Sequence, residues 1–177
     1  MDSDQKLIEL VNEGDPDAFE CLYRRYRDWV HRLAWRFTGN QQDALDVLQE
    51  TFTYLLGKFP GFELTASMTT FLYPVVKHIS LTIRSKSLRF TCDEEILREI
   101  AAPTSKETQG SRSELAVVLI VLPDEQREVL LMRFVDDMSL QEIAAALNIP
   151  IGTVKSRMYH ALQKLRKDRH TRDYFLE

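Results

Sequence analysis

The sequence predicts an all-α protein of two small helical domains joined by a flexible linker, with a helix-turn-helix in the C-terminal domain. Apolar residues recur at helical spacing in both halves of the chain, and we find no run that alternates apolar and polar residues as a half-buried strand does. The polar stretch Pro103–Ser111 separates the two halves and has the composition of a flexible linker. We therefore expect domains over residues 1–88 and 114–177, with a linker over residues 89–113.

Three helices are expected in the N-terminal half. Asp15 is a suitable N-cap and Pro16 fits the first helical position, so the first helix begins there and ends at the turn Thr38-Gly39-Asn40. The second helix covers about residues 41–56 and the third about residues 70–86, where an interior Pro74 is harmless if it falls in the first turn.

The C-terminal half carries the signals of a helix-turn-helix. Helical patterns cover about residues 114–121, 124–135, 139–147 and 151–167. Ser139 and Glu142 form a capping box, Asn148 tolerates the left-handed conformation of a tight turn, and Pro150 is well placed to open the next helix. Helix, short turn and helix together are the geometry that places a second helix in the major groove of DNA.

Composition excludes several classes of protein. Among 177 residues, 44% are hydrophobic and 28% are charged, as in a globular protein with a buried core. Cys21 and Cys92 lie far apart without a partner at metal-ligand spacing, so neither a metal site nor a disulfide framework is expected. The N-terminus has Asp2 and Asp4 where a signal peptide would be basic, and the longest apolar run, Leu115–Leu122, is too short to span a bilayer. We therefore expect a cytoplasmic protein without membrane insertion.

Charge is distributed unevenly, which matters more than the formal net charge of −4. The segment 114–150 is acidic, whereas the segment 151–173 is basic. The basic residues of that segment are Lys155, Arg157, Lys164, Arg166, Lys167, Arg169 and Arg172. We therefore expect one DNA-facing surface on an otherwise acidic protein.

The second helix of the helix-turn-helix carries the candidate reading residues near its N-terminal end. They are Thr153, Lys155, Ser156, Arg157, Tyr159 and His160. Side chains at these positions reach base edges and phosphates in such motifs. The alternative is an ordinary antiparallel helix pair whose basic face is solvated.

This half of the chain resembles region 4 of the extracytoplasmic-function sigma factors of bacterial RNA polymerase. The resemblance extends over Leu122-Pro123-Asp124-Glu125-Gln126-Arg127-Glu128-Val129, Ser139-Leu140-Gln141-Glu142-Ile143-Ala144 and Gly152-Thr153-Val154-Lys155-Ser156-Arg157. It implies a domain that binds the −35 promoter element and the flap of the polymerase β subunit.

The N-terminal half resembles region 2.2 of the same family at Asp43-Ala44-Leu45-Asp46-Val47-Leu48-Gln49-Glu50-Thr51-Phe52. The resemblance implies that Asp43, Asp46, Gln49 and Glu50 contact the coiled coil of the polymerase β′ subunit. Helical spacing independently places the acidic residues in one stripe, although such a stripe alone is usually a solvated face. Leu45 stands where the family has another acid, so the contact surface gains an apolar side chain.

The segment Phe71–Arg84 resembles regions 2.3 and 2.4, which melt and read the −10 element. Residues expected to contact this element are Phe62, Phe71, Tyr73, Lys77, His78, Arg84 and Lys86, and the family implies a base-holding loop over residues 62–70. Aromatic rings can stack on unpaired bases and cations can bind phosphates, but each ring taken singly fits core packing as well. Phe71, His78 and Thr82 depart from the usual Trp, Asn and Asp of the family.

The two halves together predict an alternative sigma factor that binds core RNA polymerase, recognises promoter DNA and assists melting. We expect no cofactor, no small-molecule substrate and no catalytic residue, because no phosphate-binding loop, metal cluster or nucleophile motif is found. An anti-sigma factor is a further possible partner. The alternatives are a stand-alone helix-turn-helix regulator and an enzyme with an accessory DNA-binding domain.

Overall fold

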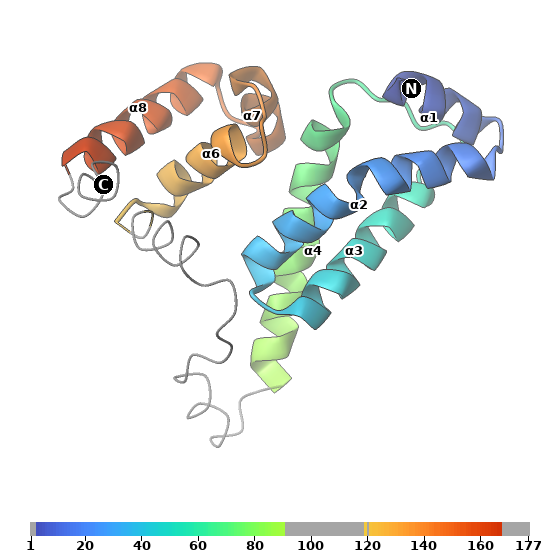
Figure 1. Cartoon of the computed structure of the whole chain (residues 1–177), viewed down its shortest axis with the longest axis horizontal. Coiled ribbons are helices and arrows are strands. Elements are labelled where there is room, and N and C mark those ends of the chain that lie inside the picture. The colour runs from blue at the N-terminus through green and yellow to red at the C-terminus, as the bar shows by residue number, and fades with distance from the viewer. Residues whose placement is uncertain (1–2, 91–118, 120, 168–177) are drawn as a thin grey trace, which may run out of the picture. The chain divides into compact units, whose positions relative to one another are not determined.

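The computed structural model describes residues 3–90, 119 and 121–167. Within these residues every regular element is an α-helix, which confirms the all-α class. The chain divides into an N-terminal unit, residues 1–101, and a C-terminal unit, residues 102–177 (Figure 1). The expected linker lies outside the described residues from residue 91 onward.

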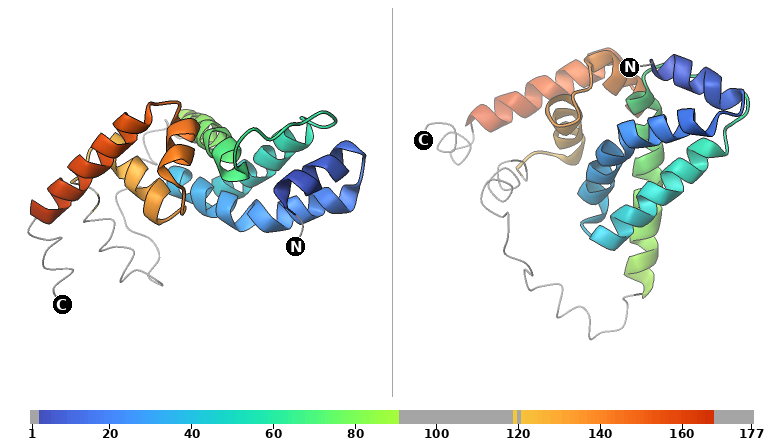
Figure 2. Two further views of the ribbon diagram at one scale, coloured as in Figure 1. Left: turned by 90° about the horizontal axis from the view of Figure 1, so that it is seen from above. Right: turned by 45° about the vertical axis from the view of Figure 1, so that its right-hand side comes forward.

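The described residues of the N-terminal unit form four helices, α1 (Asp4–Asn12), α2 (Pro16–Thr38), α3 (Gln41–Leu56) and α4 (Met68–Phe90). The helices α2, α3 and α4 pack against one another in pairs, and α1 packs on α2. Figure 2 shows α2 and α3 running side by side in two further views. Their shared core contains Leu22, Val30, Leu33, Val47, Leu55, Leu72 and Val76.

Local signals in the sequence set the ends of α2 and α3 as expected. The Asp15 side chain accepts hydrogen bonds from the N–H groups of Asp17 and Ala18, and Gly39 ends α2 with a φ of 69°. The side chain of Asn40 then accepts from the N–H groups of Gln42 and Asp43, which begins α3 at its expected residue. These contacts fix where α3 starts, and therefore which of its residues face outward.

Helix α1 was not expected from the sequence. It buries Leu7, Ile8 and Val11 against the unit, and Ser3 caps its first turn. At its start, the Asp4 carboxylate accepts hydrogen bonds from Arg25 and Tyr26 of α2. A nine-residue helix is marginal by itself, so these contacts with α2 stabilise it.

The pair of Tyr26 and Asp4 gives an expected pH dependence of stability. Burial, followed by the hydrogen bond to Asp4, raises the pKa of Tyr26 well above its ordinary value. The folded state therefore keeps the phenol proton while the unfolded chain loses it near pH 10. The contribution of protonated Tyr26 to the free energy of unfolding is therefore complete below about pH 10 and is lost as the pH rises above that value.

The substitution Tyr26→Phe is expected to lower the free energy of unfolding at pH 7 by about 1–2 kcal/mol, because the hydrogen bond to a carboxylate is lost. It should also reduce the loss of stability between pH 9 and about pH 11. Urea unfolding at a series of pH values measures both effects. An alkaline loss equal to that of the parent protein would show that Tyr26 does not cause it.

The C-terminal unit contains α6 (Asp124–Phe134), α7 (Leu140–Leu147) and α8 (Ile151–Lys167). Their bounds agree with the expected helices, whereas the helix expected over residues 114–121 lies largely outside the described residues. Helix α8 packs against both α6 and α7. The buried side chains of this unit include Val129, Met132, Met138, Ile143, Val154 and Ala161.

Arg127 holds the segment before α6 in place. Its guanidinium donates hydrogen bonds to the carbonyl oxygens of Leu119 and Leu122, at 2.9 and 2.8 Å. A third contact, at 3.1 Å, joins it to the Asp124 carboxylate in the first turn of α6. Arg127 is therefore a structural residue of the C-terminal unit.

Candidate nucleic-acid interface and acidic groove

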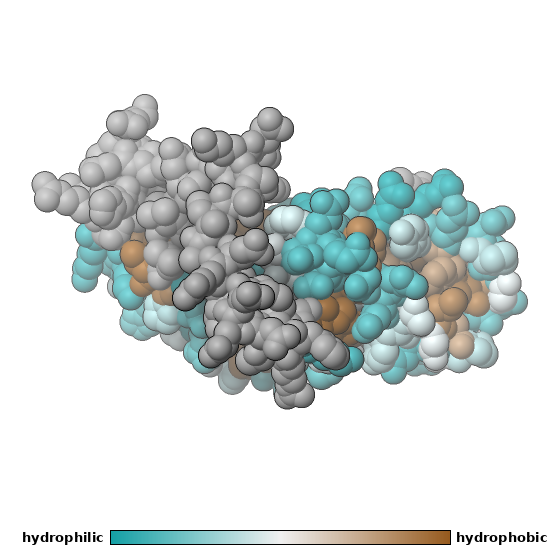
Figure 3. All heavy atoms as spheres, turned by 90° about the horizontal axis from the view of Figure 1, so that it is seen from below, coloured by the Kyte–Doolittle hydropathy of each residue, from teal (hydrophilic) through white to brown (hydrophobic). Residues whose placement is uncertain are grey.

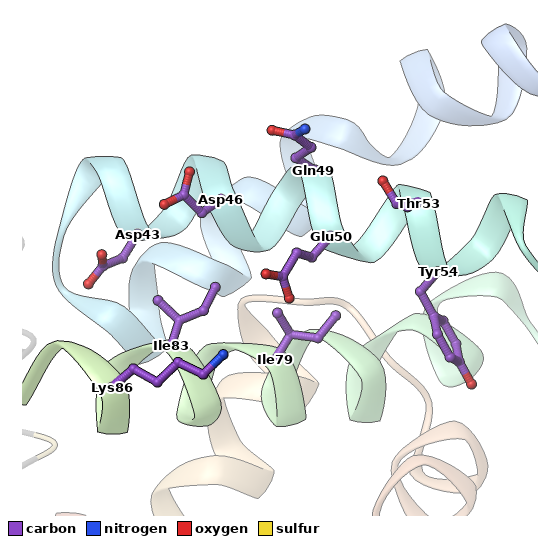
Figure 4. A pocket seen from close by; sticks show the side chains of 9 residues that line it. All are labelled: Asp43, Asp46, Gln49, Glu50, Thr53, Tyr54, Ile79, Ile83 and Lys86. Carbon is purple, nitrogen blue, oxygen red and sulfur yellow. The ribbon is translucent and has the colours of Figure 1, made fainter. Parts of the chain in front are cut away.

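An open groove between α3 and α4 collects the acidic residues of α3 (Figure 4). We call it the acidic groove; it is lined by Asp43, Asp46, Gln49, Glu50, Thr53 and Tyr54 of α3 and by Ile79, Ile83 and Lys86 of α4. Spacing of three and four residues along α3 places the acids on neighbouring turns. All four residues expected to contact the polymerase thus line one groove.

The acidic residues are accessible to a protein partner. Asp46, Gln49 and Glu50 are exposed, and Asp43 is half-buried. Figure 4 shows Glu50 pointing towards α4, whereas Gln49 points away from it. Apolar side chains of α4 lie beneath exposed carboxylates here, so the groove offers a partner both charge and apolar surface.

Lys86 lies in the acidic groove, although the sequence placed it with the residues that contact the −10 element. Its side chain extends along α4 beside Ile79 and Ile83 (Figure 4). Its cationic group therefore offsets part of the negative charge contributed by α3.

Leu45 lies on the other side of α3, away from the acidic groove. It is 43% exposed and lines an apolar groove between α2 and α3. The other residues of that groove include Phe19, Tyr23, Leu48, Phe52 and Leu56. Leu45 therefore contributes to an apolar surface on the α2 side of α3. Figure 3 shows one face of the molecule, on which apolar patches lie among hydrophilic residues.

The helix-turn-helix is formed by α7, the turn at Asn148–Pro150 and α8. Both hydrogen bonds of the capping box are present: the Ser139 hydroxyl accepts from the Glu142 N–H, and the Glu142 carboxylate accepts from the Ser139 N–H. Asn148 has a φ of 52° and a ψ of 47°, the left-handed conformation expected of it. The Pro150 carbonyl accepts from the N–H groups of Thr153 and Val154, which begins α8.

The expected reading residues share the outer side of α8. Lys155, Ser156, Tyr159 and His160 are exposed, while Thr153 and Arg157 are half-buried. Val154 and Ala161 are buried and hold the helix on its unit. The arrangement presents hydroxyl, aromatic and cationic groups from the first three turns of one helix, as direct readout of a major groove requires.

Arg157 has an ion-pair partner that the sequence did not indicate. Its Nη2 lies 2.6 Å from the Glu125 carboxylate, which belongs to the first turn of α6. The carboxylate is 70% exposed, so the contribution of the pair to stability is small, about 1 kcal/mol or less. In this structure, the pair joins α8 to the first turn of α6 and holds the guanidinium beside Glu125.

Two of the aromatic residues expected to contact the −10 element are buried. Tyr73 is fully buried and packs edge-on against Phe37 of α2, so its ring is not accessible to DNA in this conformation. Phe62 is 8% exposed and packs against Phe59 and Phe71. Both rings pack in the core, whereas Phe71 is half-buried.

The outer face of α4 carries the remaining candidates. His78 and Arg84 are exposed and Lys77 is half-buried. Arg84 donates a hydrogen bond to the Phe37 carbonyl at the end of α2, at 3.4 Å. The structure thus brings cations and an imidazole to one side of α4.

Pro74 lies inside α4 and beyond its first turn. The helix begins at Met68, two residues before the expected start, so the first-turn position that would have made the proline harmless is not the one observed. Because proline has no N–H, the Thr70 carbonyl receives no helical hydrogen bond from it. The ring is exposed, on the same side of the helix as His78.

Tyr54 lies next to Phe71 of α4, Lys58 lies next to Tyr54, and both extend the surface of the −10 candidates. They were not among the residues predicted from the sequence. The Tyr54 ring stacks on Phe71 with an interplanar angle of 19°, and the Lys58 ammonium lies 4.5 Å from the centre of the Tyr54 ring. The packing of α3 against α4 brings Tyr54 next to Phe71. Repeated aromatic residues near the C-terminus of α3 were the available signal.

Within the described part of the chain, no cluster of three or more His, Cys, Asp or Glu side chains could hold a metal ion. None of the described helices is both long enough and apolar enough to cross a membrane.

A helical unit with an acidic groove, followed in the same chain by a helix-turn-helix with a basic reading helix, defines a transcription protein that contacts both DNA and another protein. Two family models match the chain in that order: "Sigma-70 region 2" over residues 22–88 and "Sigma-70, region 4" over residues 118–167. The chain belongs to the extracytoplasmic-function sigma factors of bacterial RNA polymerase.

Individual relatives agree with this family. The ECF RNA polymerase sigma factor SigW of Bacillus subtilis (strain 168) is 31% identical over 177 residues, covering 92% of this chain and 95% of SigW. The RNA polymerase sigma-H factor of Pseudomonas aeruginosa is 26% identical and covers 94% of each chain. Among solved structures, CnrH in complex with the cytosolic domain of CnrY shares the fold, with a TM-score of 0.67 at 22% identity over 92% of this chain and 94% of CnrH.

Proposed function

We propose that this protein directs core RNA polymerase to promoters by dividing three tasks among three surfaces. The acidic groove binds the coiled coil of the β′ subunit, the outer face of α4 with its preceding loop holds the −10 element, and α8 reads the −35 element. The C-terminal unit also contacts the β flap. The protein acts in the cytoplasm as an initiation factor, and the polymerase carries out all chemistry.

The observation that carries this proposal is the gathering of Asp43, Asp46, Gln49 and Glu50 in one accessible groove of a chain that also carries a helix-turn-helix. A helix-turn-helix alone suits any operator-binding regulator. A second surface suited to a protein partner is what an initiation factor needs in addition.

An anti-sigma factor is proposed as a second partner. CnrH is described in complex with the cytosolic domain of CnrY, and RpoE of Bartonella quintana in complex with the anti-sigma factor NepR. An inhibitor of this kind would compete with the polymerase or with promoter DNA for the surfaces described above.

The test is promoter-specific transcription by purified core polymerase on fragmented genomic DNA, with and without this protein. Binding of the protein to the same fragments is measured in parallel without polymerase. We expect defined transcripts to arise when both components are present. Tight operator binding by the protein alone, without association with polymerase, would instead identify a stand-alone helix-turn-helix regulator.

A further inference from the structure

Asn12, the last residue of α1, is hydrogen-bonded to the backbone at the start of the loop that leads into α4. Its side-chain oxygen accepts from the N–H groups of Gly61 and Phe62, at 2.6 and 3.0 Å. Its side-chain nitrogen donates to the Phe62 carbonyl oxygen at 3.0 Å. A single amide thus satisfies three backbone groups about fifty residues away in the sequence.

The chain changes direction where Asn12 binds it. Gly61 has a φ of 98°, a conformation that side-chain-bearing residues rarely adopt. The next residue, Phe62, buries its ring 5.4 Å from the Phe59 ring and 4.9 Å from the Phe71 ring, measured between centres. The backbone is therefore fixed on one side by Asn12 and on the other by the aromatic core.

The far end of the same loop is fixed by Ser67. Its hydroxyl accepts a hydrogen bond from the Thr70 N–H at 3.3 Å and lies 2.8 Å from the Thr70 hydroxyl. Glu63, Thr65 and Ala66, which lie between the two anchors, are exposed. Residues 63–66, which we call the anchored loop, thus present accessible backbone and side chains while both ends are held.

We propose that Asn12 is a positioning residue for promoter melting: it holds the anchored loop in the shape that receives an unpaired base of the −10 element. The inference rests on the proposed function, because it assumes that this loop binds the −10 strand. A loop ordered before binding does not lose that conformational freedom when the base arrives, which raises affinity and sharpens base selection. Asn12 itself does not touch the DNA.

Two substitutions separate the contributions of its hydrogen bonds. Asn12→Ala removes all three, whereas Asn12→Asp keeps the acceptor for the two N–H groups and loses the donor to the Phe62 carbonyl. Ser3→Ala is the matched control, because it removes the cap of the same helix, the contact to the Lys6 N–H, without touching the loop. Melting temperatures of the three variants show what each change does to folding.

The assay uses holoenzyme reconstituted from core polymerase and full-length protein. Its probes are single strands carrying the −10 element of a promoter found in the transcription test, in four versions that differ at one base. We expect Asn12→Ala to bind the preferred strand about tenfold more weakly and to lose most of its preference among the four bases, with Asn12→Asp intermediate. Ser3→Ala should keep the base preference, and all three variants should bind core polymerase as the parent protein does.

Other outcomes would overturn the inference. If Asn12→Ala keeps the preference of the parent, or if Ser3→Ala loses it to the same extent, Asn12 supports α1 and nothing more. If Asn12→Ala does not fold, Asn12→Asp decides, and parental binding and preference in that variant refute the role. A parent holoenzyme that binds none of the four strands would contradict the proposed function itself, a failure distinct from parental behaviour of the variants.

Discussion

Reversing the charge of the acidic groove is expected to prevent assembly with core polymerase. Asp46→Lys or Glu50→Lys should weaken that binding by at least about a hundredfold, because like charges juxtaposed across an interface cost several kcal/mol. Both side chains are exposed on α3, so their replacement removes no core contact. Titration of fluorescently labelled protein with core polymerase measures the change, and promoter-specific transcription should fall in parallel.

A matched control distinguishes the groove from general electrostatic attraction. Asp28→Lys makes the same charge change on α2, at an exposed residue that does not line the acidic groove. It should bind core polymerase within about twofold of the parent. Equal losses in Asp28→Lys and Asp46→Lys would mean that net charge, and not this groove, governs assembly.

The second large effect is expected at Arg157. Arg157→Ala should weaken binding of the holoenzyme to a promoter with its −35 element by about 1–3 kcal/mol, the usual range for an arginine that contacts a base. Binding to core polymerase should not change, because Arg157 belongs to the proposed DNA-reading residues of α8 and does not line the acidic groove. Comparing promoters with and without the −35 element in the same assay isolates the contribution of α8.

Part of that loss should come from Glu125. Once Arg157 is removed, the Glu125 carboxylate has lost the cation 2.6 Å away. Its negative charge is then expected to repel the phosphates of DNA bound along α8. The double variant Glu125→Ala with Arg157→Ala should therefore bind more tightly than Arg157→Ala alone. Lys167→Ala is the positional control, since it lies about 15 Å further along α8. If it weakens binding as much as Arg157→Ala does, α8 supplies charge without a defined reading position.

The parts of the structure that could be predicted from sequence are those set by local contacts. Helix ends marked by local chemical signals were predictable. The structure has helix caps at the positions that the sequence indicated, which are Asp15 with Pro16, Gly39, the capping box at Ser139, and Asn148. A cap acts over three or four residues, so its sequence carries nearly all the information required. The acidic stripe on α3 was predictable because residues three and four apart share one face of a helix.

Features that depend on packing between helices could not be predicted from the sequence. Tyr73 and Phe71 are both aromatic residues near the start of α4, and the position of α2 decides that Tyr73 is the buried one. Helix α1 depends for its stability on contacts with α2 made through Asp4. The contact of Asn12 with Gly61 likewise joins segments that no local pattern connects.

The ion pair between Arg157 and Glu125 also bears on how ionic strength affects promoter binding. A cation that neutralises a phosphate releases condensed counterions, and each such contact adds about 0.9 to the slope of log affinity against log salt concentration. Arg157 must exchange its carboxylate partner for DNA, so the pair approaches the duplex with almost no net charge. Removing Arg157 should flatten the salt dependence less than removing the exposed Lys155 does, even where the loss of affinity is larger.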